Sequence, residues 1–163
     1  MKVLSLLLIS LIIVIGVATK PASAIAPDHG PSAFGSGGFS FFNGIRTETF
    51  SYSFDAQANK NDHATGQAEF DNLTTQTQVV VKIKCLNVDG GIAIMTGRVQ
   101  DSNDPGFPKS ANVIFAATDF ELFPFFGGDT ITPLFITPTA HFDCHDGEPL
   151  TILPAGGEIE ILP

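Results

Sequence analysis

Hydrophobic and polar residues alternate strictly along several stretches of the chain. The apolar positions of the stretch FSYSFDAQ are Phe50, Tyr52, Phe54 and Ala56. A period of two is typical of a β-strand with one buried face and one wet face. A turn rich in Asn, Asp and Gly follows, and then GQAEFDNL places Ala68 and Phe70 on one face. Residues 46–72 are therefore predicted to form a long hairpin.

The clearest strand pattern is TQVVVKIKCL, residues 77–86. One predicted face carries Val79, Val81, Ile83 and Cys85, and the other carries Val80, Lys82 and Lys84. The following turn, Asn87 to Gly91, contains an Asp-Gly step, which accepts the positive φ of a tight hairpin. The stretch IAIMTGRVQ then resumes the extended pattern, so a second hairpin is expected.

Further extended segments are expected along the rest of the chain, at residues 111–119, 129–137, 140–145, 149–153 and 157–162. No apolar stripe with a helical period is found beyond the N-terminal segment. Short strands separated by turns rich in glycine and proline predict an all-β fold. We expect a single antiparallel β-barrel or β-sandwich of about eight to ten strands, preceded by a signal peptide.

The N-terminal segment has the pattern of a secretory signal peptide. A charged start, Met1-Lys2, precedes the uncharged apolar run Val3–Ala18 and the small residues Ala22-Ser23-Ala24. This pattern predicts cleavage after Ala24, with an uncleaved anchor as the alternative. It also predicts a secreted protein, or one on the exterior of the cell envelope, with no stable membrane span after cleavage.

The remaining chain has the length of one domain. Residues 25–45 are rich in glycine and serine, and we expect a flexible lead and a first edge strand there, followed by the β-domain at 46–163. Residues 25–163 contain six of the eight basic residues and all seventeen acidic ones, so their formal charge is −11. Nucleic-acid binding requires a concentrated basic face, and this composition argues against it.

The two cysteines, Cys85 and Cys144, both lie in the predicted exported part. Oxidising conditions favour a disulfide between them, and closing a loop of about 60 residues is worth about 4 kcal/mol in the chain-entropy model. We expect both side chains to point into the interior. On a regular strand, Phe142 then faces inward with Cys144, while His141, Asp143 and His145 share the wet face.

The wet face next to Cys144 is the candidate metal site, with His141, Asp143 and His145 as its ligands. The two histidines would lie about 13 Å apart on a straight strand, too far to share an ion. Either one pairs with Asp143, and a third ligand such as His63 or Glu148 would have to come from elsewhere. A solvated face is the favoured interpretation, so no cofactor is expected and a divalent metal is the alternative. The Asn- and Asp-rich segments 59–63 and 101–106 are interpreted as turns, with calcium sites as the alternative.

The segment FELFPFF, residues 120–126, is unusually apolar around its proline. Its large apolar residues are Phe120, Leu122, Phe123, Phe125 and Phe126. The favoured interpretation is a loop that plugs one end of the β-structure. The functional alternative is a patch that binds an apolar small ligand, another subunit or a membrane surface. Asn72-Leu73-Thr74 is also a glycosylation sequon, a pattern that arises often by chance.

A resemblance to a known family is carried by FSYSFDAQA, GQAEFDN and VVVKIKCLNVDGGIAIMTGRV. These stretches resemble a family of small secreted, mostly uncharacterised proteins of bacteria and archaea, over roughly residues 48–103. Cys144 is similar to the second cysteine of that family. The resemblance implies a β-domain with a structural disulfide and without agreed catalytic residues. The apolar stretch 118–136 departs from the polar loop expected of the family.

The sequence contains no recognisable catalytic residues. No G-x-S-x-G elbow is present, and no cysteine remains reactive once the pair is bonded. We therefore expect a non-enzymatic binding or structural role with an unassigned partner. One alternative is a barrel enzyme or metal-dependent hydrolase that uses His141 and Asp143, or His63. The other is an extracellular assembly subunit in which residues 25–45 pair with a neighbour's sheet edge.

Overall fold

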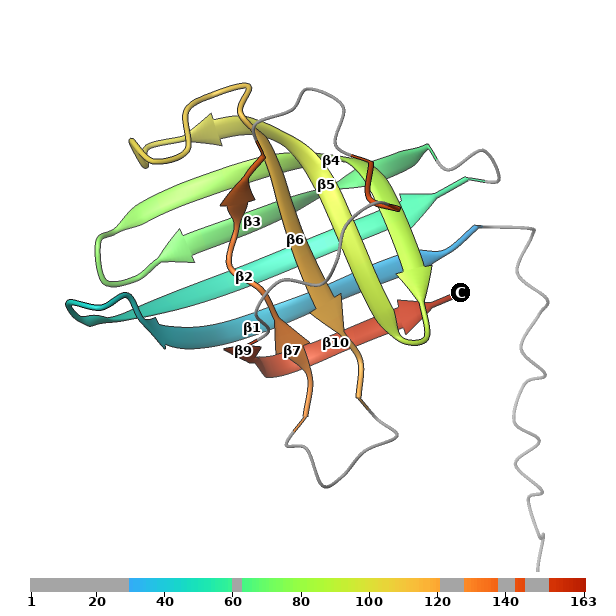
Figure 1. Cartoon of the computed structure of the whole chain (residues 1–163), viewed down its shortest axis with the longest axis horizontal. Helices are drawn as coiled ribbons and strands as arrows, with labels where there is room; N and C mark the ends of the chain where they lie inside the picture. The colour runs from blue at the N-terminus through green and yellow to red at the C-terminus, as the bar shows by residue number, and fades with distance from the viewer. Residues whose placement is uncertain (1–29, 60–62, 121–127, 138–142, 146–152) are drawn as a thin grey trace, which may run out of the picture.

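The computed structural model describes residues 30–59, 63–120, 128–137, 143–145 and 153–163 (Figure 1). The strands in these ranges are β1 Ser32–Phe42, β2 Thr47–Ala58, β3 Ala64–Asn72, β4 Thr77–Asp89, β5 Ile92–Ser102, β6 Asn112–Thr118, β7 Thr130–Ile131, β8 Phe135–Ile136, β9 Leu153–Pro154 and β10 Gly156–Leu162. No helix in the described ranges is long and apolar enough to cross a membrane. The predicted signal peptide, Met1–Ala24, lies outside them.

The described strands form one antiparallel sheet in the order β10-β1-β2-β3-β4-β5-β6-β7-β9, with β8 paired to β6. The predicted all-β antiparallel fold is confirmed, including the hairpins β2–β3 and β4–β5. At the β4–β5 turn, Gly90 and Gly91 have φ angles of 55° and 82°, as the Asp-Gly step predicts. The terminal strands of the order, β9 and β10, do not pair with each other, so the hydrogen-bonded ladder is not closed into a barrel.

The sheet curves around a single main core (Figure 1). Phe115 of β6 is fully buried, and its ring makes T-shaped contacts with Phe54 and Phe70 at centroid distances of 5.9 and 5.2 Å. The faces predicted for the first hairpin are confirmed, because Tyr52, Phe54, Ala68 and Phe70 all join this core. Burying each of these aromatic rings contributes about 1.5–3 kcal/mol, which explains why alternation specified the strands so clearly.

Strand β1 lies inside the sheet, between β2 and β10. The prediction of an edge strand in this region is wrong, because Gly156–Leu162 returns from the C-terminal end of the chain to pair with it. The glycines of β1 serve packing. A Cβ atom on Gly35 would lie 2.9 Å from the Phe54 ring and from the Ile159 side chain. A glycine there lets the aromatic core lie directly on the backbone.

The disulfide joins Cys85 to Cys144 on the outer face of the sheet, with a Cα–Cα distance of 5.8 Å. The pairing is as predicted, but the inward orientation is wrong. Ile83 pairs with Gly97 and Cys85 pairs with Thr96, so Lys84 is an extra residue, a β-bulge. A bulge reverses the alternation beyond it. Cys144 packs outside the main core, in a small cluster with Ile94, Ile114 and Ala116.

Two carboxylates bind the β10 backbone from the β6–β7 side. Asp129 Oδ2 accepts a hydrogen bond from Ile159 N at 2.9 Å, and Asp119 Oδ2 accepts one from Ile161 N at 3.4 Å. Beside them, Ala155 N donates to Asp129 O at 2.9 Å. We call this line of contacts the seam. Side-chain oxygens replace strand pairing along it, so β10 is held on both sides although the ladder stays open.

Candidate functional site: a cavity at the end of the sheet

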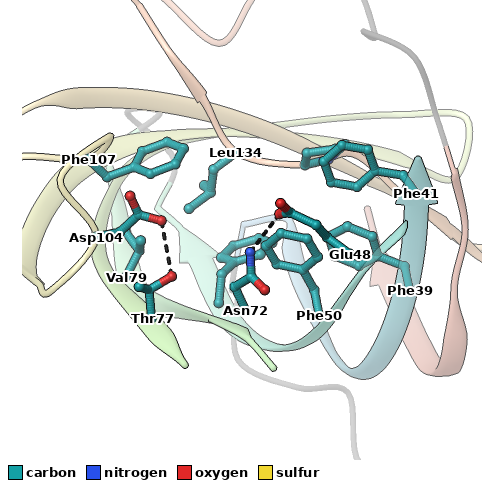
Figure 2. Close-up of a pocket in the computed structure, with 12 residues that line it drawn as sticks. Phe39, Phe41, Glu48, Phe50, Asn72, Thr77, Val79, Asp104, Phe107 and Leu134 are labelled. Carbon is teal, nitrogen blue, oxygen red and sulfur yellow. Dashed lines mark hydrogen bonds between the residues drawn. The ribbon is translucent and has the colours of Figure 1, made fainter. Parts of the chain in front are cut away.

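A cavity of about 170 Å³ lies where β1 and β3 end and β2 and β4 begin (Figure 2). Neighbouring antiparallel strands run in opposite directions, so these four ends meet on one side of the molecule. Its apolar lining consists of Phe39, Phe41, Phe50, Phe70, Val79, Phe107, Pro133 and Leu134. Its polar lining consists of Glu48, Asn72, Thr77 and Asp104.

The apolar wall is mainly aromatic. The Phe50 ring stacks on Phe39 and on Phe41, with centroid distances of 5.0 and 5.6 Å. Figure 2 shows Phe107 and Leu134 across the cavity from Phe50. Phe39 is 4% exposed and belongs to the main core, whereas Phe107 and Leu134 are half-buried. The cavity is thus an extension of the core that was left unfilled at one end.

Glu48 joins two turns at the mouth of the cavity. Its Oε1 accepts a hydrogen bond from Asn43 Nδ2 and its Oε2 accepts one from Asn72 Nδ2, both at 2.7 Å. Each asparagine also caps its own turn, because its Oδ1 accepts backbone N–H bonds from the residues that follow. Glu48 further forms an ion pair of 3.3 Å with Arg46. These contacts hold the carboxylate in place at the cavity wall.

Asp104 supplies the second carboxylate of the cavity. Its Oδ2 accepts a hydrogen bond from Thr77 Oγ1 at 3.1 Å, and its Oδ1 accepts one from Gly106 N at 2.8 Å. The segment 101–106 therefore forms a turn, as predicted, in which Asp104 binds its own backbone. The same turn brings Phe107 over the cavity.

The lining of the cavity has one sign of charge. Its described members include the carboxylates of Glu48 and Asp104 and no lysine, arginine or histidine. Both carboxylates already accept hydrogen bonds, yet a carboxylate has about four acceptor sites, so each can accept another. The polar part of the cavity therefore favours a molecule that donates hydrogen bonds or carries positive charge.

Exposed apolar side chains surround this end of the sheet. Phe42, the last residue of β1, is 66% exposed, and Ile45, in the turn after it, is 88% exposed. Leu73, directly after β3, is 58% exposed. Leu73 N donates to Thr49 O at 2.8 Å, which places the β3–β4 turn against β2. These three side chains lie at the same end of the sheet as the cavity, but none of them lines it.

The predicted apolar patch is only partly described. Phe120 is half-buried and its N donates to Asp129 Oδ1 at 3.3 Å, whereas Leu122, Phe123, Phe125 and Phe126 lie outside the described residues. Phe120 does not line the cavity. The phenylalanines that do line it come from other strands and from the loop after β5.

The predicted metal site is also partly described. Residues 143–145 form a turn, not the expected strand, with Cys144 fully buried and Asp143 and His145 exposed. One ligand atom from each of Cys85, Asp143, Cys144 and His145 lies within 4.8 Å of the others, but the disulfide occupies both sulfurs. Two ligands remain. His141 and Glu148 lie outside the described residues, and His63 is an exposed residue of the β2–β3 turn.

Tyr52, whose pKa is raised, lies at the seam and does not line the cavity. Burial, and secondarily the negative charge of Asp129, raise the pKa of Tyr52 to about 12. The Tyr52 hydroxyl donates to Gly156 O at 3.4 Å. The phenol is therefore neutral at physiological pH and acts as a structural donor beside β10.

Comparisons of the chain with protein-family models, with curated proteins and with solved structures found no match. The resemblance to small secreted β-domain proteins therefore stays a prediction. The function has to be inferred from the geometry of the cavity.

Sequence reasoning missed the cavity because its residues look ordinary one strand at a time. Glu48 and Asn72 are 24 residues apart, and each occupies an expected position near a strand end. One signal was present. Asn72 falls on the apolar face of its strand, in register with Ala68 and Phe70, and a polar residue there is buried with a partner or lines a cavity. It is 6% exposed.

Proposed function

We propose that the protein is a secreted, non-enzymatic binding protein for a small, mainly apolar molecule, and that the end cavity is its binding site. The N-terminal pattern and the disulfide support export. The cavity carries the binding proposal, because cavities of about 150 Å³ with apolar walls accept molecules the size of benzene. A ring of that size fits between the stacked phenylalanines and Leu134.

The ligand that fits the lining is aromatic or compact and aliphatic, with one cationic or hydrogen-bond-donating group. Glu48 and Asp104 supply acceptors; Arg46 forms an ion pair with Glu48, whereas no described cation forms one with Asp104. Aromatic faces also attract cations, at about 0.5–1 kcal/mol or more per contact. An anionic ligand of the same shape would face two carboxylates and is disfavoured.

The test compares three probes of nearly equal shape: benzylamine, benzyl alcohol and benzoate. Binding is followed by amide chemical shifts at Phe50, Asn72 and Phe107. We expect saturable shifts with benzylamine, weaker ones with benzyl alcohol and none with benzoate. Equal responses to all three would contradict the proposed charge preference, and no response to any of them would contradict the binding site.

Two variants locate the binding. Leu134→Trp fills the cavity and is expected to abolish benzylamine binding, whereas Leu162→Trp places the same ring at an exposed position on β10 and is expected to leave it unchanged. Asp104→Asn removes one charge; its single side-chain oxygen can still accept from Gly106 N, and its amide can donate to Thr77 Oγ1. This variant is expected to weaken the binding of benzylamine more than that of benzyl alcohol. If the two tryptophan variants behave alike, the probes bind elsewhere.

A further inference from the structure

A second pocket, of about 120 Å³, lies on the side of β4, β5 and β6 that is opposite the main core. Lys84, Thr96, Arg98, Asn112 and Thr137 line it. Lys84 is the bulge residue of β4. Arg98 of β5 pairs directly with Asn112 of β6. The pocket shares no residue with the end cavity and is large enough for several water molecules.

Positive charge gathers at this pocket in an otherwise acidic protein. The described residues include five lysines and arginines, and two of these, Arg46 and Lys109, form ion pairs with Glu48 and Asp101. The other three are Lys82, Lys84 and Arg98, neighbours on β4 and β5.

None of these three neighbours forms an ion pair with a described residue, and no acidic residue lines the pocket. Lys82 is paired directly with Arg98 across the two strands. Like charges in that position repel, and a bound anion relieves the repulsion.

Thr137 provides an independent observation. Its backbone N donates to Asn112 O at 2.9 Å, which fixes the residue at the pocket wall. Its side chain is buried, with the residue 8% exposed, and its Oγ1 makes no hydrogen bond with any described residue. Buried hydroxyls nearly always have a partner, so an unpaired one in a pocket points to a missing acceptor.

We propose that this pocket binds a small oxyanion of the phosphate, sulfate or carboxylate type. Lys84 and Arg98 supply the positive charge, and the Thr137 hydroxyl donates a hydrogen bond to an anion oxygen. Arg98 Nε donates to Asn112 Oδ1 at 3.3 Å, which orients the guanidinium and leaves its terminal N–H groups for the anion. This site is independent of the function proposed for the end cavity.

The test is a titration of the disulfide-bonded protein at constant ionic strength, followed by the amide signals of Gly97, Asn112 and Thr137. Separate arms use inorganic phosphate, methyl phosphate and acetate, which distinguish a free ion, a phosphomonoester and a carboxylate. Saturable shifts at these amides with at least one of the three support the proposal. Shifts with none of them, or shifts that spread evenly over the protein, overturn it.

Three variants separate a specific site from general charge attraction. Thr137→Val keeps the shape of the side chain, and Arg98→Gln removes the charge. Each is expected to lower the affinity for the anion about tenfold. Lys109→Gln removes an exposed cation elsewhere and is expected to change affinity less than twofold. Thr137→Val should also leave the anion-free protein at least as stable as the wild type, because the hydroxyl that it removes has no partner among the described residues. Unchanged affinity in Thr137→Val, or an equal loss in Lys109→Gln, overturns the proposal.

Discussion

Ile83 and Cys85 lie on opposite faces of the sheet, although only one residue separates them. Ile83 is fully buried in the main core, whereas the sulfur of Cys85 is bonded to Cys144 on the outer face. The residue between them, Lys84, has no partner in the pairing of β4 with β5. One extra residue therefore decides that the disulfide fastens residues 143–145 to the outer face of the sheet.

Deleting Lys84 is expected to turn Cys85 toward the core, because the bulge is removed and regular alternation is restored. The disulfide then cannot form across the outer face. Thiol titration of unfolded, unreduced protein should find no free thiol in the wild type or in Lys84→Ala, and two in the deletion variant. A deletion variant without free thiols would show that the bulge does not determine the orientation.

Replacing both cysteines with alanine is expected to lower the free energy of unfolding by up to about 4 kcal/mol. The fold should survive, because the main core is complete without either sulfur. Urea unfolding measures the loss, and far-ultraviolet circular dichroism checks that the strands remain. Reduced wild-type protein is the matched control and should resemble the double variant. A double variant without β-structure would show that the disulfide bond is required for folding.

Tyr52 is expected to titrate near pH 12 in the folded protein, since burial and Asp129 both disfavour the phenolate. It is the single tyrosine of the chain, so tyrosinate absorbance reports on it alone. The unfolded chain loses this proton near its ordinary value, 10.0. The stabilisation linked to the neutral phenol is thus complete below about pH 10 and is lost as the pH rises through the folded pKa. Tyr52→Phe should lack this part of the alkaline destabilisation; the same pH dependence in that variant would assign it to other groups.

Asp129→Ala is expected to reduce the free energy of unfolding by about 1–3 kcal/mol, because it removes the acceptor of the Ile159 N–H at the seam. Asp129→Asn keeps a side-chain oxygen there and should cost less. Both should lower the pKa of Tyr52, since the negative charge near the phenol is gone. Asp55→Ala, at an exposed position on β2, is the control and should change neither quantity. An unchanged Tyr52 pKa in Asp129→Asn would contradict this account.

Asn72→Asp and Asn43→Asp form a matched pair around Glu48. Each replaces a 2.7 Å hydrogen bond to Glu48 with a contact between two carboxylates, and each keeps the oxygen that caps its turn. Asn72 is buried and Asn43 is exposed. Low solvent screening should make Asn72→Asp cost about 1–3 kcal/mol in urea unfolding, against less than about 1 kcal/mol for Asn43→Asp. Equal costs would show that burial at the cavity wall does not matter.

The local pattern of the chain determined most of the fold. Alternation identified the long hairpins and the residues of their buried faces, because one face of each strand packs on the core and the other meets water. The chemistry of the two cysteines determined their pairing. These properties depend on neighbours in sequence and on the oxidising compartment that the N-terminal pattern predicts.

The tertiary structure alone decided which residues meet. The last strand returned to pair with β1, so a glycine-rich stretch that resembled a flexible lead became an inner strand. The Lys84 bulge reversed the face of Cys85 and moved the buried positions of β4 to Leu86 and Val88, a shift that the apolar character of Cys85 concealed in the sequence. Glu48 and Asn72 met at the cavity, and Arg98 and Thr137 at the outer pocket, only because strand order and register placed them there. Pairing between distant strands is set by the packing of the whole core, and no single stretch of sequence contains that information.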